Sequence, residues 1–376
     1  MSNFKRIISI IFLIAISAVA FLLFIKDKDI ARVSENKIQD KVYVASEESG
    51  EITVVSVKDR VVMDRISLSS ETRGIKTVLY PHNVQVAPNN KSVWVTANAY
   101  LMNMKKNTDM AGMSMDINCE IIVIDPLTDK IIKRMEMGAG LHLSHIVLTP
   151  DSNYAIAVAQ SGGAIFKINA NTYEIEKEIF IEKGSEPHGL RISPDGKTAY
   201  IAIMEGKSLG ILDIDQMSLT YVPLKGKAVQ SGVTPDGKYA LASIYYPPSL
   251  AVYEISSAKL SYVDLPPRSL GMVQIYPTPN SQFVFVADQG YFFNQFAGEY
   301  VYKIDLKEMS IAQTIKAGSA PHGVVVSNDG KLVFVTNMLS NNLSVIDADS
   351  GKEIARIKVG RMPNGVSIFY SGGVSE

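Results

Sequence analysis

The sequence predicts an all-β protein, a seven-bladed β-propeller whose blades have four strands each. One observation is a repeated pattern, Pro-His-Gly followed by Asp-Gly-Lys, which occurs in residues 187–197 and again in residues 321–331. A second is its spacing, because degenerate copies follow one another at 41 to 49 residues, apart from one interval of 62. Short apolar strands with such a period are typical of propeller blades. The longest interval contains an insertion at residues 101–119, and a second insertion lies near residues 289–299.

One repeat shows how the strands of a blade follow from the sequence. Residues 190–192 form the expected first strand, and the Ser-Pro-Asp-Gly-Lys segment 193–197 forms the hairpin turn. Proline fixes φ near the value that the turn needs, and glycine adopts the positive φ that closes it. The second to fourth strands are expected in three further apolar and β-branched runs bounded by turn residues: 198–203, 208–214 and 219–223.

The two ends of the repeat region are expected to share one blade. Residues 41–68 supply three strands without a first strand before them, and residues 363–369 supply a first strand with nothing after it. Pairing them completes the seventh blade and closes the ring, which removes exposed sheet edges. The propeller is therefore predicted over residues 41–370, followed by a short tail, 371–376.

The N-terminus carries a predicted membrane segment. Two basic residues within 1–6 precede an apolar run over 7–25, and a charged stretch over 26–40 follows it. The run is about long enough for a helix to cross a bilayer, and the preceding charges place residues 1–6 in the cytoplasm. A cleaved signal peptide is the alternative; the apolar run continues past the small residues 18–20, which favours a retained anchor. With 26–40 as linker, the propeller is expected on the extracytoplasmic side, in the periplasm or at the cell surface.

Charge and cysteine content narrow the partners. The chain has 37 basic and 38 acidic residues, whereas proteins that hold nucleic acid normally carry a basic excess. The single cysteine, Cys119, excludes an intrachain disulfide. We expect a monomer without a nucleic-acid partner, attached to a membrane through its N-terminal helix.

The segment Val-Phe-Val-Thr-Asn at 333–337, with Pro-His-Gly at 321–323 and Asp-Gly-Lys at 329–331, resembles the YVTN-repeat, YncE-like β-propellers. The resemblance covers roughly residues 41–370 and is specific for fold. The wider resemblance includes propeller domains of haem-containing nitrite reductases and nitrous oxide reductase, and seven-bladed lactonases. A shared fold does not select among these activities. Nitrous oxide reductase binds copper with a histidine from nearly every blade, a pattern broken here at Ser144, Val229, Val273 and Asn364.

All five histidines lie in loops that lead into first strands, which propeller topology gathers around the central mouth on one face. They are His82, His142, His145, His188 and His322. The insertion at 101–119 rises from the same face in this topology. It carries five methionines and ends at the cysteine: Met102, Met104, Met110, Met113, Met115 and Cys119. Thioether and thiolate ligands select Cu(I), and imidazole suits copper in either oxidation state. These eleven residues are the hypothesised metal ligands, with copper as the candidate cofactor.

Structural roles are the alternative for each of these groups. Buried imidazoles often serve only as hydrogen-bond partners of neighbouring blades, and loop methionines pack over apolar surfaces. Cys119 precedes a strand and fits a small buried apolar residue. Aromatic residues in the second insertion are expected near the mouth, as a cover for a ligand or as a cap on a blade.

The sequence is compatible with three functions. The first is an extracytoplasmic, membrane-anchored binding protein that holds copper, another small ligand or a protein partner at the mouth. The second is a lactonase-like or redox enzyme that uses the same mouth, with His188, His322 and Glu186 as acid–base candidates. The third is a surface scaffold or adhesion protein.

Overall fold

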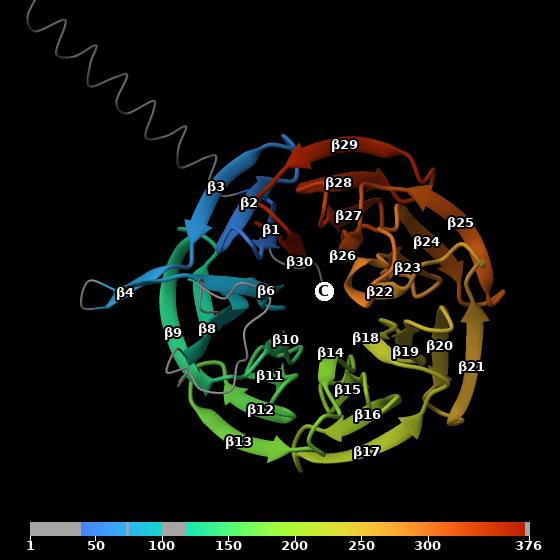
Figure 1. Cartoon of the computed structure of the whole chain (residues 1–376), viewed down its shortest axis with the longest axis horizontal. Helices are drawn as coiled ribbons and strands as arrows, with labels where there is room; N and C mark the ends of the chain where they lie inside the picture. The colour runs from blue at the N-terminus through green and yellow to red at the C-terminus, as the bar shows by residue number, and fades with distance from the viewer. Residues whose placement is uncertain (1–38, 73–74, 100–117, 373–376) are drawn as a thin grey trace, which may run out of the picture. The chain divides into compact units, whose positions relative to one another are not determined.

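A computed structural model describes residues 39–72, 75–99 and 118–372 of the chain. Seven four-stranded antiparallel sheets are arranged around a central axis (Figure 1). The predicted seven-bladed, all-β propeller is therefore confirmed. None of the helices among the described residues is long and apolar enough to cross a membrane. The predicted membrane segment 7–25 lies outside the described residues, so it stays a prediction.

The blades follow one another along the chain, each with its strands in sequence order from the axis outward. The first full blade is β6 (Leu79–Val86), β7 (Val93–Ala99), β8 (Asn118–Asp125) and β9 (Lys130–Ala139). The second is β10 (Leu143–Leu148), β11 (Tyr154–Ala159), β12 (Ala164–Asn169) and β13 (Ile175–Phe180). The third is β14 (Pro187–Ile192), β15 (Thr198–Ile203), β16 (Ser208–Asp213) and β17 (Ser218–Pro223).

Three more blades complete the sequential set. The fourth is β18 (Ala228–Val233), β19 (Tyr239–Ile244), β20 (Ser249–Glu254) and β21 (Lys259–Asp264). The fifth is β22 (Met272–Pro277), β23 (Phe283–Asp288), β24 (Tyr300–Asp305) and β25 (Ser310–Lys316), with the short helix η1 (Tyr291–Phe293) between β23 and β24. The sixth is β26 (Pro321–Val326), β27 (Leu332–Asn337), β28 (Asn342–Asp347) and β29 (Glu353–Lys358).

The seventh blade joins the two ends of the propeller, as predicted. Its strands, from the axis outward, are β30 (Pro363–Phe369), β1 (Lys41–Ser46), β2 (Glu51–Ser56) and β3 (Val62–Ser67). The closing pair β30–β1 is antiparallel and places Lys41 opposite Phe369 and Val42 opposite Ile368. A separate two-stranded ribbon is formed by β4 (Ser70–Thr72) and β5 (Ile75–Thr77).

Apolar packing between neighbouring blades forms the core. The second and third strands are largely buried, whereas outer strands such as β13 and β17 are mostly exposed. Trp94, for example, is fully buried between its own blade and Phe166 and Ile168 of the next blade. Burial of a large apolar side chain contributes about 1.5–3 kcal/mol, so contacts of this kind hold the ring together.

The Asp-Gly turns form as the sequence indicates. In the turn after β14, Ser193 Oγ donates to Asp195 Oδ1 at 2.5 Å and accepts from Thr198 N at 3.0 Å. Asp195 Oδ1 also accepts from Lys197 N at 3.1 Å. Gly196 has φ of +73°, the left-handed region that favours glycine. These turns lie on the face away from the histidines.

Hydroxyl groups on second strands tie each of three blades to the next blade. Thr336 Oγ1 accepts from Gly323 N at 2.7 Å and donates to Asn364 O at 2.8 Å in the following blade. Thr96 and Ser243 make equivalent bonds in their blades. Since Gly323 follows His322, these bonds also hold the backbone of the mouth.

Removal of this hydroxyl is expected to cost stability. Thr336→Val keeps the side-chain shape but leaves Gly323 N–H and Asn364 C=O without their partner, and a buried unsatisfied group costs about 1–3 kcal/mol. We expect urea unfolding to give a free energy lower by about 1–3 kcal/mol. Thr220→Val on the exposed strand β17 is the matched control and is expected to change it by about 0.5 kcal/mol or less. Equal effects of the two substitutions would contradict the assignment.

Candidate metal site at the central mouth

The mouth histidines come from the starts of first strands. His82, His188 and His322 occupy equivalent positions in β6, β14 and β26, and His145 lies one place later in β10. Each of these strands has a register irregularity at that point; in β14, Pro187 pairs with Ile203 but Leu190 pairs with Ile201. Such a bulge inserts one extra residue and re-aims the side chains beside it. The same irregularity in several blades turns the imidazoles toward one another.

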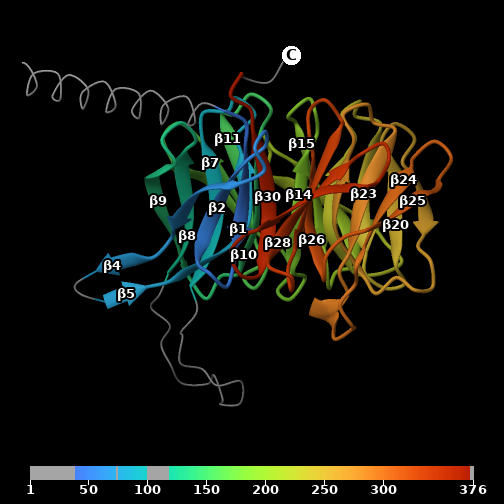
Figure 2. The same ribbon diagram turned by 90° about the horizontal axis from the view of Figure 1, so that it is seen from above.

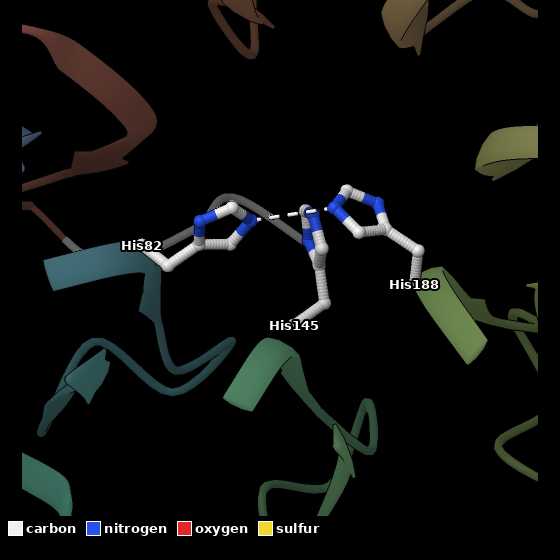
Figure 3. Close-up of side chains that lie close together, drawn as sticks. All are labelled: His82, His145 and His188. Atoms are coloured by element: carbon white, nitrogen blue, oxygen red, sulfur yellow. Dashed lines mark hydrogen bonds between the residues drawn. The ribbon is translucent and has the colours of Figure 1, made fainter. Parts of the chain in front are cut away.

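Three of the histidines form a close group (Figure 3). Each of His82, His145 and His188 offers one ring nitrogen, and these nitrogens all lie within 4.8 Å of one another. The Nε2 atoms of His82 and His188 are 3.4 Å apart. The three side chains are buried, and they come from three consecutive blades. Among the described residues, these three histidines form the cluster whose geometry could hold a metal ion.

Hydrogen bonds orient two members of the trio. His188 Nδ1 lies 2.9 Å from Val229 O, a carbonyl that can only accept, so the Nδ1 atom carries the proton and Nε2 presents a lone pair to the trio. His82 Nδ1 lies 3.2 Å from Asn364 Nδ2 and 4.0 Å from Glu47 Oε2. A backbone carbonyl thus orients His188 and a side-chain amide orients His82, and outer partners commonly hold metal-ligating histidines in this way.

A chain of amides reaches the third member. Gln230 Oε1 accepts from Ser231 N at 3.1 Å, and Gln230 Nε2 donates to Gln274 Oε1. Gln274 Nε2 therefore faces His145 Nε2, at 3.3 Å. His145 Nδ1 is buried and has no hydrogen-bond partner among the described residues. His145 is thus held at one nitrogen and unsatisfied at the other.

Burial keeps the imidazoles neutral. It is the main cause that lowers the pKa of every one of the five histidines, to about 4 for His188 and about 3 for His322. The neighbouring imidazoles lower the pKa of His82 and His145 further, because two positive charges in one cavity repel. Neutral imidazole is the form that binds metal ions, so the trio needs no deprotonation at pH 7.

Loops between second and third strands form the walls around the histidines. The cavity has a volume of about 350 Å³ and is lined by Glu47, His82, His142, Gln160, His188, Met204, Val229, Val273, Phe292 and His322. Four histidines line this cavity, and His145 lies beside two of them in the trio. The predicted grouping of the five histidines on one face is therefore confirmed. Phe292, from η1, stands 5.9 Å from the His322 ring, centre to centre, so the second insertion reaches the mouth as expected.

Glu47 and Gln160 were not predicted from the sequence. Glu47 Oε2 accepts from Asn364 Nδ2 at 3.0 Å, and burial raises the pKa of the Glu47 carboxyl. Both residues directly follow a second strand, the position that Met204 and Met338 occupy in their blades. Alignment of the blades on that position, in addition to the histidine position, would have found them.

His322 and His142 border the trio. His322 Nδ1 lies 2.6 Å from Gln289 Nε2, and His322 Nε2 is buried without a hydrogen-bond partner among the described residues. The same Gln289 amide lies 3.3 Å from Met338 Sδ. The His142 ring stands edge-on to His82, with ring centres 5.0 Å apart. Both histidines line the cavity and are available to a ligand larger than one ion.

The remaining candidates lie elsewhere. Cys119 is buried beside Trp94, its Sγ contacts Leu141 O at 2.6 Å, and burial raises the pKa of the Cys119 thiol. This placement fits the small buried residue that was the alternative for Cys119. Glu186 accepts a hydrogen bond from Gln160 Nε2 at 3.1 Å but does not line the cavity. The predicted ligands Met102, Met104, Met110, Met113 and Met115 lie outside the described residues.

Comparisons with known proteins agree with the architecture. Residues 281–371 match the family model of the YNCE-like β-propellers, a range that contains the Val-Phe-Val-Thr-Asn segment, and the predicted resemblance is confirmed. Among solved structures, the chain is similar to Kuenenia stuttgartiensis hydrazine synthase, with a TM-score of 0.61 and 16% identity over 76% of this chain and 88% of that chain. At this level of identity the similarity shows the fold alone. Curated protein sequences gave no match.

Proposed function

We propose that this protein is a metal-binding propeller that holds a transition-metal ion, copper in preference to others, between His82, His145 and His188. The observation that carries the proposal is the trio itself: three buried imidazoles with their nitrogens within 4.8 Å of one another. Buried polar atoms are normally hydrogen-bonded, and an exception calls for an explanation such as an unseen ion. The unsatisfied His145 Nδ1 is such an exception.

The hydrogen bonds of the trio support this proposal. His188 keeps its proton on Nδ1, toward Val229 O, and its Nε2 lone pair is ready to bind an ion. For His82 to ligate through Nε2, its proton must move to Nδ1, where the Glu47 carboxylate is 4.0 Å away. His145 is unsatisfied at Nδ1 and touches Gln274 at Nε2 only through a 3.3 Å contact. Ion binding therefore requires the His82 proton to move to Nδ1 and the Asn364 amide, whose Nδ2 now lies 3.2 Å from that nitrogen, to turn away.

Copper is favoured by the donor types. Imidazole sites bind Cu²⁺ more tightly than the other divalent first-row metals, and thioethers select Cu(I). Met204 supplies a thioether on the cavity wall, and the sequence adds five methionines in residues 102–115. The apolar run 7–25 supports a membrane-anchored protein whose propeller is extracytoplasmic. We favour binding over catalysis because the acid–base candidate Glu186 is not part of the cavity wall.

Metal titration of the protein tests the proposal. We expect one equivalent of copper to bind, and His188→Gln to weaken binding by at least about 100-fold, because each ligand and its partners carry a large share of the affinity. The control is His322→Gln, the same chemical change on the same cavity wall but outside the trio, which is expected to retain binding within about threefold. Titrations with Cu(I), Cu²⁺ and Zn²⁺ against a competing chelator would rank the metals. Equal copper affinity in the wild type and in His188→Gln would overturn the proposal.

Glu47 offers a second, independent check. Glu47→Gln keeps the size of the side chain but removes the charge near His82 Nδ1. Loss of such a supporting partner typically costs about 10–100-fold in metal affinity. An unchanged affinity would leave the trio in place and remove Glu47 from the site.

A further inference from the structure

The propeller has a second cavity, at the opposite face from the histidines. It has a volume of about 190 Å³ and lies where the first strands end. Figure 2 shows the propeller from the side, so that both faces can be seen. The loop containing η1 projects from one face, and β30 ends at the opposite face. None of the three trio histidines is among the residues that line this cavity.

One layer of the repeat forms the floor of this cavity. Three positions after the His188 equivalent, the first strands contribute Gln85, Val147, Arg191, Gly232, Tyr276, Val325 and Ser367. Four of these seven line the cavity: Gln85, Tyr276, Val325 and Ser367. Arg191 does not itself line the cavity, but its guanidinium carbon lies 6.0 Å from the centre of the Tyr276 ring, which does. Arg191 is the one permanent charge in this layer.

The charge of Arg191 has no counterion among the described residues. Arg191 forms none of the ion pairs found there, and its Nη1 donates only to the carbonyl of its own neighbour, Leu190, at 2.8 Å. Among the described residues that line the cavity there is no aspartate or glutamate. Burial also lowers the pKa of the Arg191 guanidinium, which reflects the cost of holding this charge away from water. Arg191 is half-buried rather than enclosed, so its unpaired charge remains accessible to a partner from solution.

The rim of the cavity supplies further hydrogen-bond donors. Asn90 Oδ1 accepts from Tyr370 N at 3.2 Å, which fixes the amide and leaves Nδ2 as a donor. Asn90 Nδ2 is buried and has no partner among the described residues. The Tyr276 hydroxyl, which is protonated because burial raises its pKa, likewise forms no hydrogen bond to a described residue. A cation and two donors without an acceptor are complementary to an anion.

We propose that this cavity binds a small oxyanion, a carboxylate or phosphate group, which pairs with Arg191 and accepts hydrogen bonds from Asn90 and Tyr276. A volume of about 190 Å³ suits an anion of a few heavy atoms rather than a nucleotide. The cavity lies at the opposite face from the metal trio, although the charge of Arg191 reaches His145 and lowers its pKa. The repeat supports a separate role for each face: histidines at the start of the first strands, and a lone arginine near their end.

Calorimetric titration of the metal-free protein with inorganic phosphate, and separately with acetate, tests this site. We expect saturable binding of at least one of them, and the tighter of the two identifies the group. Arg191→Gln is expected to weaken that binding by about 10- to 100-fold, the size of one charge-assisted hydrogen bond. Arg191→Lys, which keeps the charge, is expected to weaken it less than Arg191→Gln. Arg268→Gln, at an exposed arginine, is the control and is expected to change nothing.

A second substitution protects the test against misfolding. Asn90→Asp places a negative charge on the rim without altering the strand, and it is expected to weaken phosphate binding at least tenfold at pH 7.5. The proposal is overturned if neither anion binds, or if Arg191→Gln and Asn90→Asp bind as tightly as the wild type. Copper titration of Asn90→Asp separates this result from the proposed function, because Asn90 lines the second cavity and not the histidine cavity, so loss of anion binding in this variant is expected to leave copper binding unchanged.

Discussion

Asp129→Asn is expected to destabilise the propeller by about 3–5 kcal/mol. Lys41, fully buried in the closing blade, donates through Nζ to Asp129 Oδ2 at 2.8 Å and to Pro126 O at 2.7 Å in the neighbouring blade. Tyr43 Oη also donates to Asp129 Oδ1, at 2.6 Å. The substitution keeps the shape of the side chain and suits the positive φ of 56° at this position. It leaves the Lys41 charge buried without a counterion, which is the costly outcome for a buried pair.

Urea unfolding of four variants checks this expectation. Lys41→Met combined with Asp129→Asn removes both charges and is expected to recover a large part of the loss, because an apolar replacement of a buried pair is often tolerated. Glu299→Gln, which breaks the exposed pair Lys316–Glu299 at 3.5 Å, is the control and is expected to cost about 1 kcal/mol or less. If the double variant were as unstable as the sum of its two single variants, the buried charge would not be the cause.

The repeat explains why the architecture could be predicted from the sequence. Turn residues such as Asp195 and Gly196 act through their own segment, and they recur in register from blade to blade. The strands missing at each end of the repeat predicted that residues 41–68 and 363–369 share one blade, and the structure closes it by pairing Lys41 with Phe369. The same register predicted the face on which His82, His145 and His188 meet, because equivalent positions of a propeller lie around one axis.

Individual side-chain contacts could not be predicted in this way. Glu47 and Asn364 are 317 residues apart in the sequence but lie in the same closing blade, and strand pairing alone did not specify that their side chains form a hydrogen bond. Arg191 and Tyr276 share a layer of the repeat, but only the geometry of β14 and β22 places a cation against that ring. Which histidines form the trio also depended on the bulges, whose exact directions no spacing in the sequence specifies.

Acid is expected to destabilise the protein well before its carboxylates titrate. Burial lowers the pKa of all five histidines in the folded state, whereas an unfolded histidine has a pKa of about 6.5. As the pH falls below about 6.5, the unfolded chain therefore binds protons that the folded protein does not, and stability is lost. His188, with a pKa of about 4, and His322, with a pKa of about 3, stay neutral in the folded protein at pH 5. Each then costs about 2 kcal/mol relative to pH 7.5.

Unfolding measured between pH 7.5 and pH 5 in the presence of a metal chelator tests this dependence. His322→Gln removes one titrating group, so its loss of stability over this range is expected to be smaller than that of the wild type by about 2 kcal/mol. Glu47 acts in the opposite direction, because its raised pKa makes the folded protein bind a proton earlier as the pH falls. Glu47→Gln is therefore expected to steepen the loss slightly. A free energy of unfolding that stays constant from pH 7.5 to pH 5 would contradict the burial of neutral imidazoles, and with it the state in which the trio is ready to bind a metal ion.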